Sequence, residues 1–253
     1  MKPLTDALRS LWAWGATFLL MLAWCPFLAL IRVLDRDPVR YRTGRWFRRL
    51  GAAMVRVNPA WRLHVSGEMV PDPRRPYVVV CNHQSHADIP LISCLPWEMK
   101  WLAKTELFRL PVIGWMLRLA GDIPVDRQDR RRAAQALIRA RWYLQNRCSV
   151  MFFPEGTRSP DANVHDFNDG AFHIAIQEQV PVLPLAIDGS FDCLPKHSWI
   201  FGKPSDVRLE VLPPVETTGM TKGDVQTLNA QVRGAIISRV AAWRKCESPD
   251  VQS

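Results

Sequence analysis

The chain has 253 residues, with 33 Lys and Arg against 24 Asp and Glu, which gives a formal net charge of +9. This length accommodates one large α/β domain, with or without a membrane-associated appendage. The charge indicates an anionic partner, and eleven tryptophans favour a membrane interface over nucleic acid, since Trp concentrates at the level of lipid headgroups. The six cysteines lack the paired spacing of zinc or redox motifs, so we expect free thiols.

Residues 11–31 form an apolar run without a charged side chain. At about 1.5 Å per residue, a helix of this length reaches roughly 31 Å, enough to cross the hydrocarbon core of a bilayer. Pro26 interrupts the run, so a helical hairpin that dips into one leaflet is an alternative to a straight span. Residues 32–56 then hold eight arginines and two aspartates, an excess that predicts a cytoplasmic location for the following domain.

Apolar residues recur at helical spacing from Trp46 to Val57, with arginines between them. This pattern predicts an amphipathic helix that lies in the membrane interface. The alternative is an ordinary surface helix that packs on the protein core.

The rest of the chain alternates between predicted strands and helices. Strands are expected at 61–66, 78–81, 99–103, 149–153, 181–187 and 207–212, and helices at 88–94, 112–120, 129–146, 170–177 and 223–244. Residues 121–127 are expected to form a turn. The alternation predicts an α/β fold with a mixed, largely parallel sheet flanked by helices, preceded by an N-terminal membrane-associated helical segment.

Polar residues follow directly after the apolar strand Val78–Cys81. Asn82 and His83 come first, and Asp88 lies five residues beyond the histidine. A carboxylate that holds one imidazole nitrogen leaves the other nitrogen free to take a proton, so this pair has the form of an oriented general base. The alternative is that Asp88 only caps the helix that follows.

A second polar group follows the strand that ends at Phe153. Glu155, Gly156, Thr157 and Arg158 lie there, just beyond a strand, where α/β sheets place groups that bind ligands. Glycine allows a backbone turn that other residues resist, and arginine can hold a phosphate through two parallel hydrogen bonds. The alternative is that Glu155 and Arg158 pair with each other at a structural corner.

Together these segments resemble the lysophosphatidic acid acyltransferases, the 1-acylglycerol-3-phosphate O-acyltransferase family. Four blocks match in the family's order, over about residues 46–215: Asn82-His83 with Asp88, then 121–127, 153–159 and 180–184. Lys104 also fits a basic position that the family uses. The resemblance implies membrane-anchoring and interfacial helices over residues 1–57, a glycerolipid acyltransferase domain over 58–246 and a C-terminal tail over 247–253.

The resemblance also implies a role for each residue. His83 would be the general base on a glycerol hydroxyl, with Asp88 orienting its ring, and no metal or cofactor is implied beyond the acyl-CoA or acyl carrier protein co-substrate. The acceptor would be bound by Lys104, Glu155, Gly156, Thr157 and Arg158.

The tetrahedral oxyanion of such a reaction needs hydrogen-bond donors. We predict that backbone N–H groups in the turn of Asn82, Gln84 and Ser85 supply them. Cys81 is expected to be a buried strand residue rather than a nucleophile, and His86 to face solvent or to support the site.

The predicted reaction moves a fatty acyl group to the sn-2 hydroxyl of lysophosphatidic acid, giving phosphatidic acid. Another lysophospholipid, glycerol 3-phosphate or an aminoacyl lipid is an alternative acceptor, and a non-catalytic module that binds anionic membranes is an alternative of another class. Nucleic acid is not expected as a partner, because no recognition motif is present. The sequence departs from the family at residues 167–170. Relatives commonly carry Phe-Lys-x-Gly there, whereas this chain has Asn168 in place of the lysine, followed by Asp169. Helix capping would explain both residues.

Overall fold

The computed structural model describes residues 2–70, 72–126, 129–194, 200–201 and 204–247. Its strands are β1 (Trp61–Gly67), β2 (Val78–Cys81), β3 (Met99–Lys104), β4 (Ile123–Val125), β5 (Ser149–Phe152), β6 (Val182–Asp188) and β7 (Ser205–Val211). Its α-helices are α1 (Lys2–Leu34), α2 (Tyr41–Val57), α3 (Asp88–Ile92), α4 (Ile113–Ala120), α5 (Arg130–Gln145), α6 (Gly170–Glu178) and α7 (Val225–Glu247). Two short 3₁₀ helices, η1 (Thr105–Arg109) and η2 (Lys222–Asp224), precede α4 and α7.

The strands form one sheet in the order β1-β7-β6-β2-β5-β3-β4. Adjacent strands are parallel except β6 and β7, which are antiparallel. The predicted mixed, largely parallel sheet is therefore confirmed. The central strand β2 pairs with β5 and β6, and all three are almost wholly buried, as expected for strands covered by helices on both faces.

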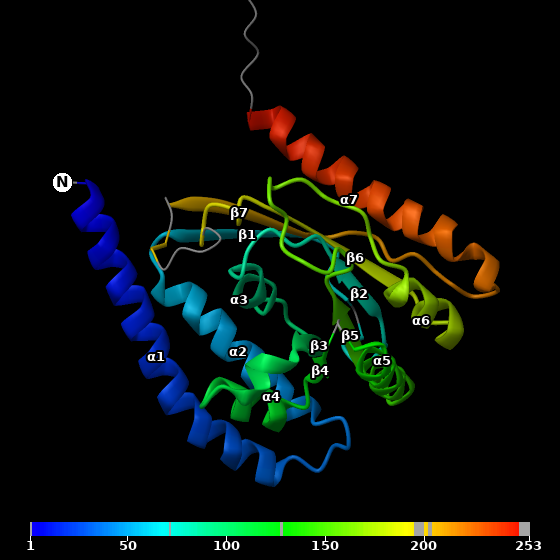
Figure 1. The fold of residues 1–253 in the computed structure, drawn as a ribbon, viewed down its shortest axis with the longest axis horizontal. Coiled ribbons are helices and arrows are strands. Elements are labelled where there is room, and N and C mark those ends of the chain that lie inside the picture. The colour runs from blue at the N-terminus through cyan, green and yellow to red at the C-terminus, as the bar shows by residue number, and fades with distance from the viewer. Residues whose placement is uncertain (1, 71, 127–128, 195–199, 202–203, 248–253) are drawn as a thin grey trace, which may run out of the picture.

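Alternate residues of β2 point into two different layers of core. Val78 and Val80 pack with α5, α6 and α7, whereas Val79 and Cys81 pack with α3 and with Val55 of α2. Figure 1 shows α5, α6 and α7 on one side of the sheet and α1 to α4 on the other. The period of two along a strand thus produces the three layers of the fold.

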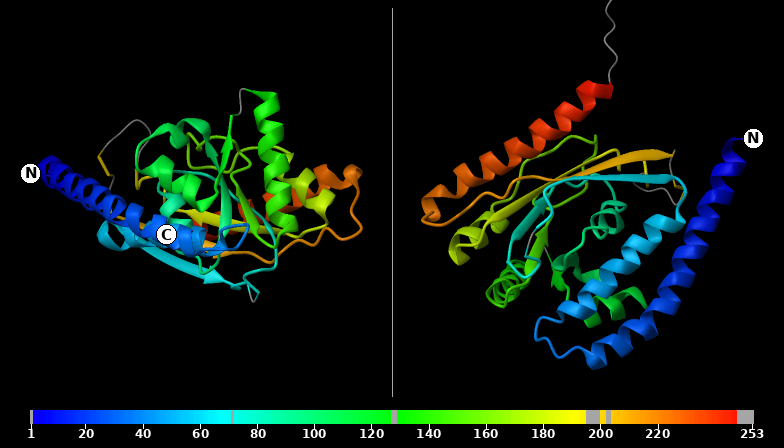
Figure 2. Two further views of the ribbon diagram at one scale, coloured as in Figure 1. Left: turned by 90° about the horizontal axis from the view of Figure 1, so that it is seen from below. Right: turned by 180° about the vertical axis from the view of Figure 1, so that it is seen from behind.

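Helix α1 is one continuous helix, with Pro26 inside it, so no hairpin forms within residues 11–31. Its segment Asp6–Leu34 has a hydropathy of 2.1 and is long and apolar enough to cross a membrane. Helix α2 lies beside α1 (Figure 2), and Leu28 of α1 packs with Phe47 and Leu50 of α2 and with Met116 of α4. Large apolar side chains of α1 remain exposed, although some of them also contact the rest of the protein: Leu8, Leu11, Trp12, Trp14, Phe18, Leu19, Leu22, Phe27, Leu30, Val33 and Leu34.

The apolar side of α2 faces protein. Phe47 and Leu50 are buried in the cluster with α1 and α4, and Val55 is buried against the sheet. This arrangement agrees with the alternative interpretation of residues 46–57, in which the helix packs on the protein core.

A buried network of charges joins α2 to the sheet. Arg48 Nη2 donates to Asp122 Oδ2 at 2.6 Å, and Lys100 Nζ donates to Glu98 Oε1 at 2.9 Å. Arg48 Nε lies 3.5 Å from Glu98 Oε2, which connects the two pairs, and all four residues are at most 6 % exposed. A Cβ atom on Gly44 would lie 2.0 Å from Glu98 Oε1, so only glycine allows α2 to approach the network this closely.

The predicted turn at 121–127 contains a strand that the sequence did not indicate. β4 has three residues and pairs with β3 at the edge of the sheet, where Pro124 removes no hydrogen bond from a second neighbour. So short a strand, with proline inside it, has no readable period. Arg127 and residues 248–253 lie outside the described residues.

Candidate active site

The candidate active site lies where β2 ends at the centre of the sheet. His83 Nδ1 lies 2.8 Å from Asp88 Oδ2. His83 is 8 % exposed and Asp88 is fully buried. The predicted contact between the two side chains is therefore present, and the carboxylate defines the ring orientation of the histidine.

Asp88 Oδ2 also accepts hydrogen bonds from two backbone N–H groups, of Gln84 at 2.7 Å and of Ser85 at 2.9 Å. Asp88 is the first residue of α3, and its side chain caps no N–H of that helix. The carboxylate instead turns back to the strand end. The alternative in which Asp88 only caps a helix is therefore wrong.

The imidazole of His83 stacks on the ring of Phe153, with centroids 3.9 Å apart and planes 16° from parallel. Its Nε2 has no hydrogen-bond partner among the described residues. With Nδ1 donating to Asp88, the neutral ring carries its lone pair on Nε2. This atom can accept a proton.

Glu155 links the two turns that carry the site. Its Oε1 accepts from the backbone N–H of His83 at 2.7 Å, and its Oε2 accepts from the backbone N–H of His165 at 3.2 Å. Burial raises the pKa of Glu155, while the two N–H donors oppose that shift. Both carboxylate oxygens are therefore used within the protein. Gly156 follows with φ +78, the left-handed conformation that glycine adopts without strain.

Arg158 is half-buried, and its guanidinium makes no hydrogen bond or ion pair with any residue that the structure describes. Glu155 and Arg158 are both described, and they do not pair with each other. The alternative prediction of a structural Glu155–Arg158 corner is therefore wrong. Ser159 N donates to His83 O at 2.7 Å, so the arginine lies one residue from a direct contact with the catalytic turn. Thr157 is exposed beside it.

The arginine also acts on His86, which is partly exposed to solvent. Desolvation by the surrounding protein and then the positive charge of Arg158 lower the pKa of His86 to about 4. The positive charge of Arg158 is therefore felt at His86, three residues after His83.

The turn after β2 is held by its own side chains. Asn82 exchanges two hydrogen bonds with the backbone of Ile187, at 2.8 and 3.0 Å, and Ser85 Oγ donates to Leu194 O at 3.2 Å. The N–H groups of His83, Gln84 and Ser85 already donate to carboxylates. The geometry therefore does not support the prediction that these N–H groups are oxyanion donors; Asn82, Gln84 and Ser85 shape the turn instead.

Lys104 ends β3, on the same edge of the sheet as His83 but two strands away. Its side chain is 73 % exposed, and its Nζ lies 3.3 Å from Glu106 Oε1. Lys104 is therefore a solvent-facing cation at the rim of the site, and it does not lie in the turn that carries Arg158.

Asp169, rather than Asn168, occupies the N-cap position of α6, and neither side chain makes a capping hydrogen bond to the helix. Asn168 Nδ2 donates to Pro154 O at 2.8 Å, which ties it to the turn that carries Glu155. Asp169 Oδ1 accepts from Asn229 Nδ2 of α7 at 2.7 Å. Both residues thus anchor the loop between β5 and α6.

Sequence reasoning missed Phe153 as the stacking partner of His83, and it missed Asp188 and Arg244 altogether. Asp188 ends β6 and accepts a hydrogen bond from Gln84 Nε2 at 2.9 Å. Its position at the end of an apolar strand is the same signal that led to His83, so it could have been found. Arg244 lies in the last turns of an amphipathic helix, and no local pattern distinguishes it.

A central strand of a mixed sheet thus ends in a histidine oriented by a buried carboxylate, beside an unpaired arginine. A family model described as acyltransferase matches residues 62–188, half of the chain. The chain belongs to the acyltransferase family.

Within this family, the chain is similar to several enzymes named 1-acyl-sn-glycerol-3-phosphate acyltransferase. A chloroplastic one from Arabidopsis thaliana is 34% identical over 204 residues, which are 79% of this chain and 56% of the plant protein. The alpha enzyme of Mus musculus is 36% identical over 179 residues, 70% of this chain and 63% of its own. One from Haemophilus influenzae is 29% identical over 202 residues, 78% and 80% of the two chains.

The chain thus spans little more than half the length of the plant relative. The crystal structure of the 1-acyl-sn-glycerophosphate acyltransferase PlsC from Thermotoga maritima aligns over 100% of both chains, with a TM-score of 0.79 and 27% identity. The fold described above is therefore that of an acyltransferase of known structure.

Proposed function

We propose that this protein is an O-acyltransferase that moves a fatty acyl group from a thioester, acyl-CoA or acyl carrier protein, to the sn-2 hydroxyl of lysophosphatidic acid. The names of its relatives support this acceptor. The observation that carries the proposal is the 2.8 Å contact between His83 Nδ1 and Asp88 Oδ2, which leaves His83 Nε2 without a partner among the described residues.

In the proposed reaction, His83 Nε2 removes the proton of the acceptor hydroxyl while the hydroxyl oxygen attacks the thioester carbonyl carbon. Asp88 stabilises the imidazolium that forms. The tetrahedral intermediate then collapses with cleavage of the carbon–sulfur bond, and Nε2 returns the proton to the departing thiolate. An ester and a free thiol result, and no acyl-enzyme is formed.

The nearby cysteine fits this direct transfer. Cys81 is fully buried, and its pKa is raised well above the ordinary value by burial. A thiolate is the nucleophilic form of cysteine, so a thiol held neutral in the core is a poor nucleophile.

We assign the acceptor phosphate to Arg158, whose planar guanidinium suits bidentate contacts with phosphate oxygens. Lys104 adds a second positive charge at the rim. Glu155, Gly156 and Thr157 shape the turn that presents the arginine. Asn168 stands where relatives commonly carry lysine, so Arg158 is proposed to hold the phosphate without that additional cation.

We further propose that the site faces a membrane. Exposed apolar side chains recur along α1 from Leu8 to Leu34, and Leu107, Leu110 and Trp115 of the adjoining η1–α4 segment are also exposed. An apolar surface of this extent marks a contact with lipid or protein. The eight arginines at 32–56 favour the cytoplasmic face and an anionic leaflet.

The acceptor is tested with purified full-length protein in detergent. Acyl-CoA or acyl carrier protein thioester is supplied with lysophosphatidic acid, glycerol 3-phosphate or lysophosphatidylcholine, and the products are identified by mass. Phosphatidic acid formed with the largest kcat/KM supports the proposal. Preference for a neutral or zwitterionic acceptor would contradict it and would explain the missing lysine at position 168.

The catalytic assignment is tested with His83→Ala and Asp88→Asn. General-base catalysis is typically worth ~10²–10⁴-fold, so His83→Ala should lose at least that much in kcat. Asp88→Asn should also be severe, because an amide cannot stabilise the imidazolium. Activity of His83→Ala close to that of the parent would overturn the assignment of His83 as the general base. Only a parent protein that transfers no acyl group to any of these acceptors would favour the non-catalytic membrane-binding module.

A further inference from the structure

The side chain of Gln84 is almost fully buried, at 3 % exposure, and is held from three sides. Its Nε2 donates to Asp188 Oδ1 at 2.9 Å and to Ala162 O at 3.0 Å. Its Oε1 accepts from Ser190 Oγ at 3.2 Å. These bonds fix the rotamer of Gln84, and with it the backbone of the turn after β2.

The backbone N–H of Gln84 is one of the donors that hold the catalytic carboxylate. It donates at 2.7 Å to Asp88 Oδ2, the same oxygen that contacts His83 Nδ1. Any shift of Gln84 therefore moves a direct partner of the His83–Asp88 pair. Since catalysis depends on sub-ångström placement of the base, such a shift lowers the rate.

Asp188 is the anchor on which Gln84 depends, and Arg244 of α7 holds it through both oxygens. Arg244 Nη2 donates to Asp188 Oδ1 at 2.7 Å, and Nε donates to Oδ2 at 3.1 Å. The side chain of Asp188 is 14 % exposed, so the bidentate arginine also offsets the desolvation of this carboxylate.

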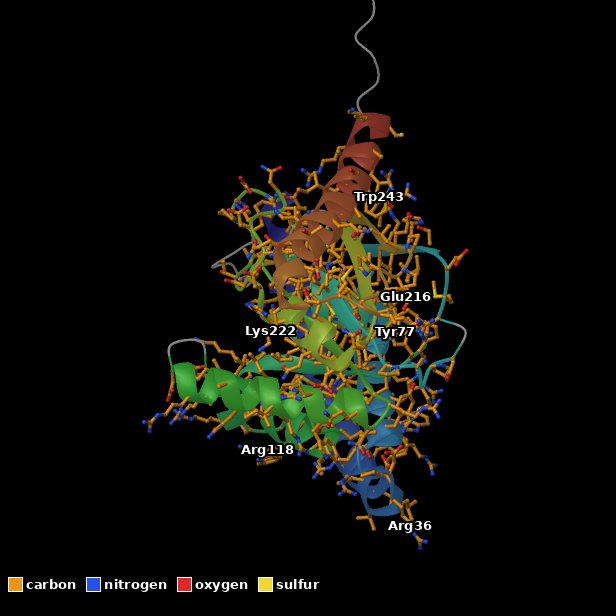
Figure 3. The ribbon with its side chains drawn as sticks, turned by 90° about the vertical axis from the view of Figure 1, so that its right-hand side faces the viewer. Arg36, Tyr77, Arg118, Glu216, Lys222 and Trp243 are labelled. Carbon is orange, nitrogen blue, oxygen red and sulfur yellow. The ribbon has the colours of Figure 1, made fainter. Side chains whose placement is uncertain are left out.

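The same arginine reaches the loop that carries Arg158. Its Nη2 donates to Ala162 O at 2.7 Å, and its Nη1 donates to Asn163 Oδ1 at 3.1 Å. Ala162 O is also an acceptor for Gln84, and Ala162 has a positive φ of 64, so this backbone is held in a conformation that alanine disfavours. Figure 3 labels Trp243, the residue before Arg244, in the last turns of α7.

We infer that Arg244 is a positioning residue for acyl transfer: through Asp188 and Gln84 it holds the His83–Asp88 pair, and through Ala162 and Asn163 it holds the loop of Arg158. The inference rests on the proposed function. A residue of the C-terminal helix, far from His83 in sequence, thus sets the position of the base relative to the phosphate-binding loop.

The test compares two arginines of α7 that are each paired with a carboxylate. Arg239 is ion-paired with Glu210 of β7, with side-chain exposure of 41 % against 36 % for Arg244. The hydrogen-bond partners of Glu210 among the described residues are Ser66 and Arg239, not Gln84 or the loop of Arg158. Arg244→Met and Arg239→Met are purified as full-length chains in detergent. For each, kcat, the KM of lysophosphatidic acid and the KM of acyl-CoA are measured per mole of folded protein.

Arg244→Met should lower kcat about 10- to 100-fold, because a displacement near 1 Å costs rates of this size. It should raise the KM of lysophosphatidic acid, through the Arg158 loop, and leave the KM of acyl-CoA unchanged. Arg239→Met should change none of the three. A merely structural role would reduce the yield of folded protein and leave these constants alone.

Arg244→Lys is the second variant, which retains the charge if Arg244→Met does not fold. Lysine can neutralise Asp188 but cannot bond both of its oxygens and Ala162 O together, so kcat should be intermediate. A kcat equal to that of the parent in either variant, or equal losses in Arg244→Met and Arg239→Met, overturns the inference. His83→Ala is measured in parallel. Turnover that survives in it overturns the proposed role of His83 as well, whereas loss of turnover in His83→Ala with Arg244→Met unaffected overturns this inference alone.

Discussion

Single residues of the turn after β2 serve both the fold and the proposed chemistry. One oxygen of Asp88 accepts from His83 Nδ1 and from two backbone N–H groups, so the group that orients the base also closes the turn. Glu155 does the same on the other side, where it holds the backbone of His83. Arg158 differs, since no partner among the described residues uses its guanidinium. An unpaired cation one residue from the Ser159–His83 backbone contact is the feature that points to a ligand.

Arg158→Ala should raise the KM of lysophosphatidic acid roughly 10- to 100-fold and affect the KM of acyl-CoA far less. Hydrogen bonds to charged groups are worth about 1.5–3 kcal/mol, which corresponds to this range. Arg158→Lys should recover only part of the loss, because lysine lacks the bidentate fork. Steady-state kinetics with each substrate varied in turn provides the measurement, and equal effects on both substrates would indicate a structural corner.

His86 should make the protein more sensitive to acid. Its pKa is lowered from 6.5 to about 4 in the folded protein, first by desolvation and then by Arg158. Between these values the unfolded chain binds a proton at His86 that the folded chain does not, so stability decreases as the pH falls from 6.5 towards 4.

His86→Gln removes this titration. The Tm of the variant should decrease less between pH 8 and pH 5 than the Tm of the parent, when both are measured by thermal unfolding in the same detergent. All other histidines are common to the two proteins, so they cancel in the comparison. An identical drop in Tm would contradict the predicted effect.

Among the elements, α2 combines two roles that its sequence suggests separately. Its apolar residues pack against α1 and α4, and its buried Arg48 reaches Asp122 and Glu98 next to the sheet. Helices α1 and α2 are thus joined to the sheet by a buried interface. Because β3 begins in this network and ends at Lys104, the network also sets where that strand reaches the rim of the site.

Arg48→Met should destabilise the protein by about 3–5 kcal/mol, because it leaves two buried carboxylates short of a positive partner. At roughly 2–4 °C per kcal/mol, this lowers Tm by about 10 °C. Arg62→Met is the matched control, since Arg62 pairs with Asp206 on the surface and both side chains are more than half exposed. An equal change in Tm in the two variants would show that the buried network stabilises the protein no more than a surface ion pair does.

At the scale of the whole molecule, α1 is shared between two environments. Its inner side buries Leu28 with α2 and α4, while its outer side exposes a continuous apolar surface. Trp12 Nε1 and Trp24 Nε1 also donate to the backbone of α2, at 3.3 and 3.0 Å. The helix is therefore part of the protein core as well as the proposed membrane contact.

Deletion of residues 1–34 should lower Tm and promote aggregation, since it uncovers Phe47, Leu50 and Met116. It should also abolish retention on vesicles.

The matched variant replaces only three exposed residues of α1, Leu11, Leu19 and Leu30, by Ser; these side chains are at least 60 % exposed. It should keep the parent Tm in detergent but bind vesicles more weakly. Vesicle flotation at low and high salt separates apolar from ionic binding, and release of the parent protein by salt alone would contradict the proposed membrane contact.

Much of this protein was predictable from sequence because the signals are local. The apolar strand before His83, the period of the helices and the length of the first apolar run each depend on residues near one another in the chain. The spacing of His83 and Asp88 is also local, so their contact followed from the turn between them. The four ordered motifs indicated the family on the same basis.

Tertiary structure decided which polar groups are free. The N–H groups of the catalytic turn, the natural candidates for an oxyanion hole, are occupied by Asp88 and by Glu155 from a turn 72 residues away. Gln84, Asp188 and Arg244 meet only because β2, β6 and the end of α7 converge at one edge of the sheet. A hydrogen bond depends on the positions of both partners, and when these lie on distant segments only the packed fold brings them within reach.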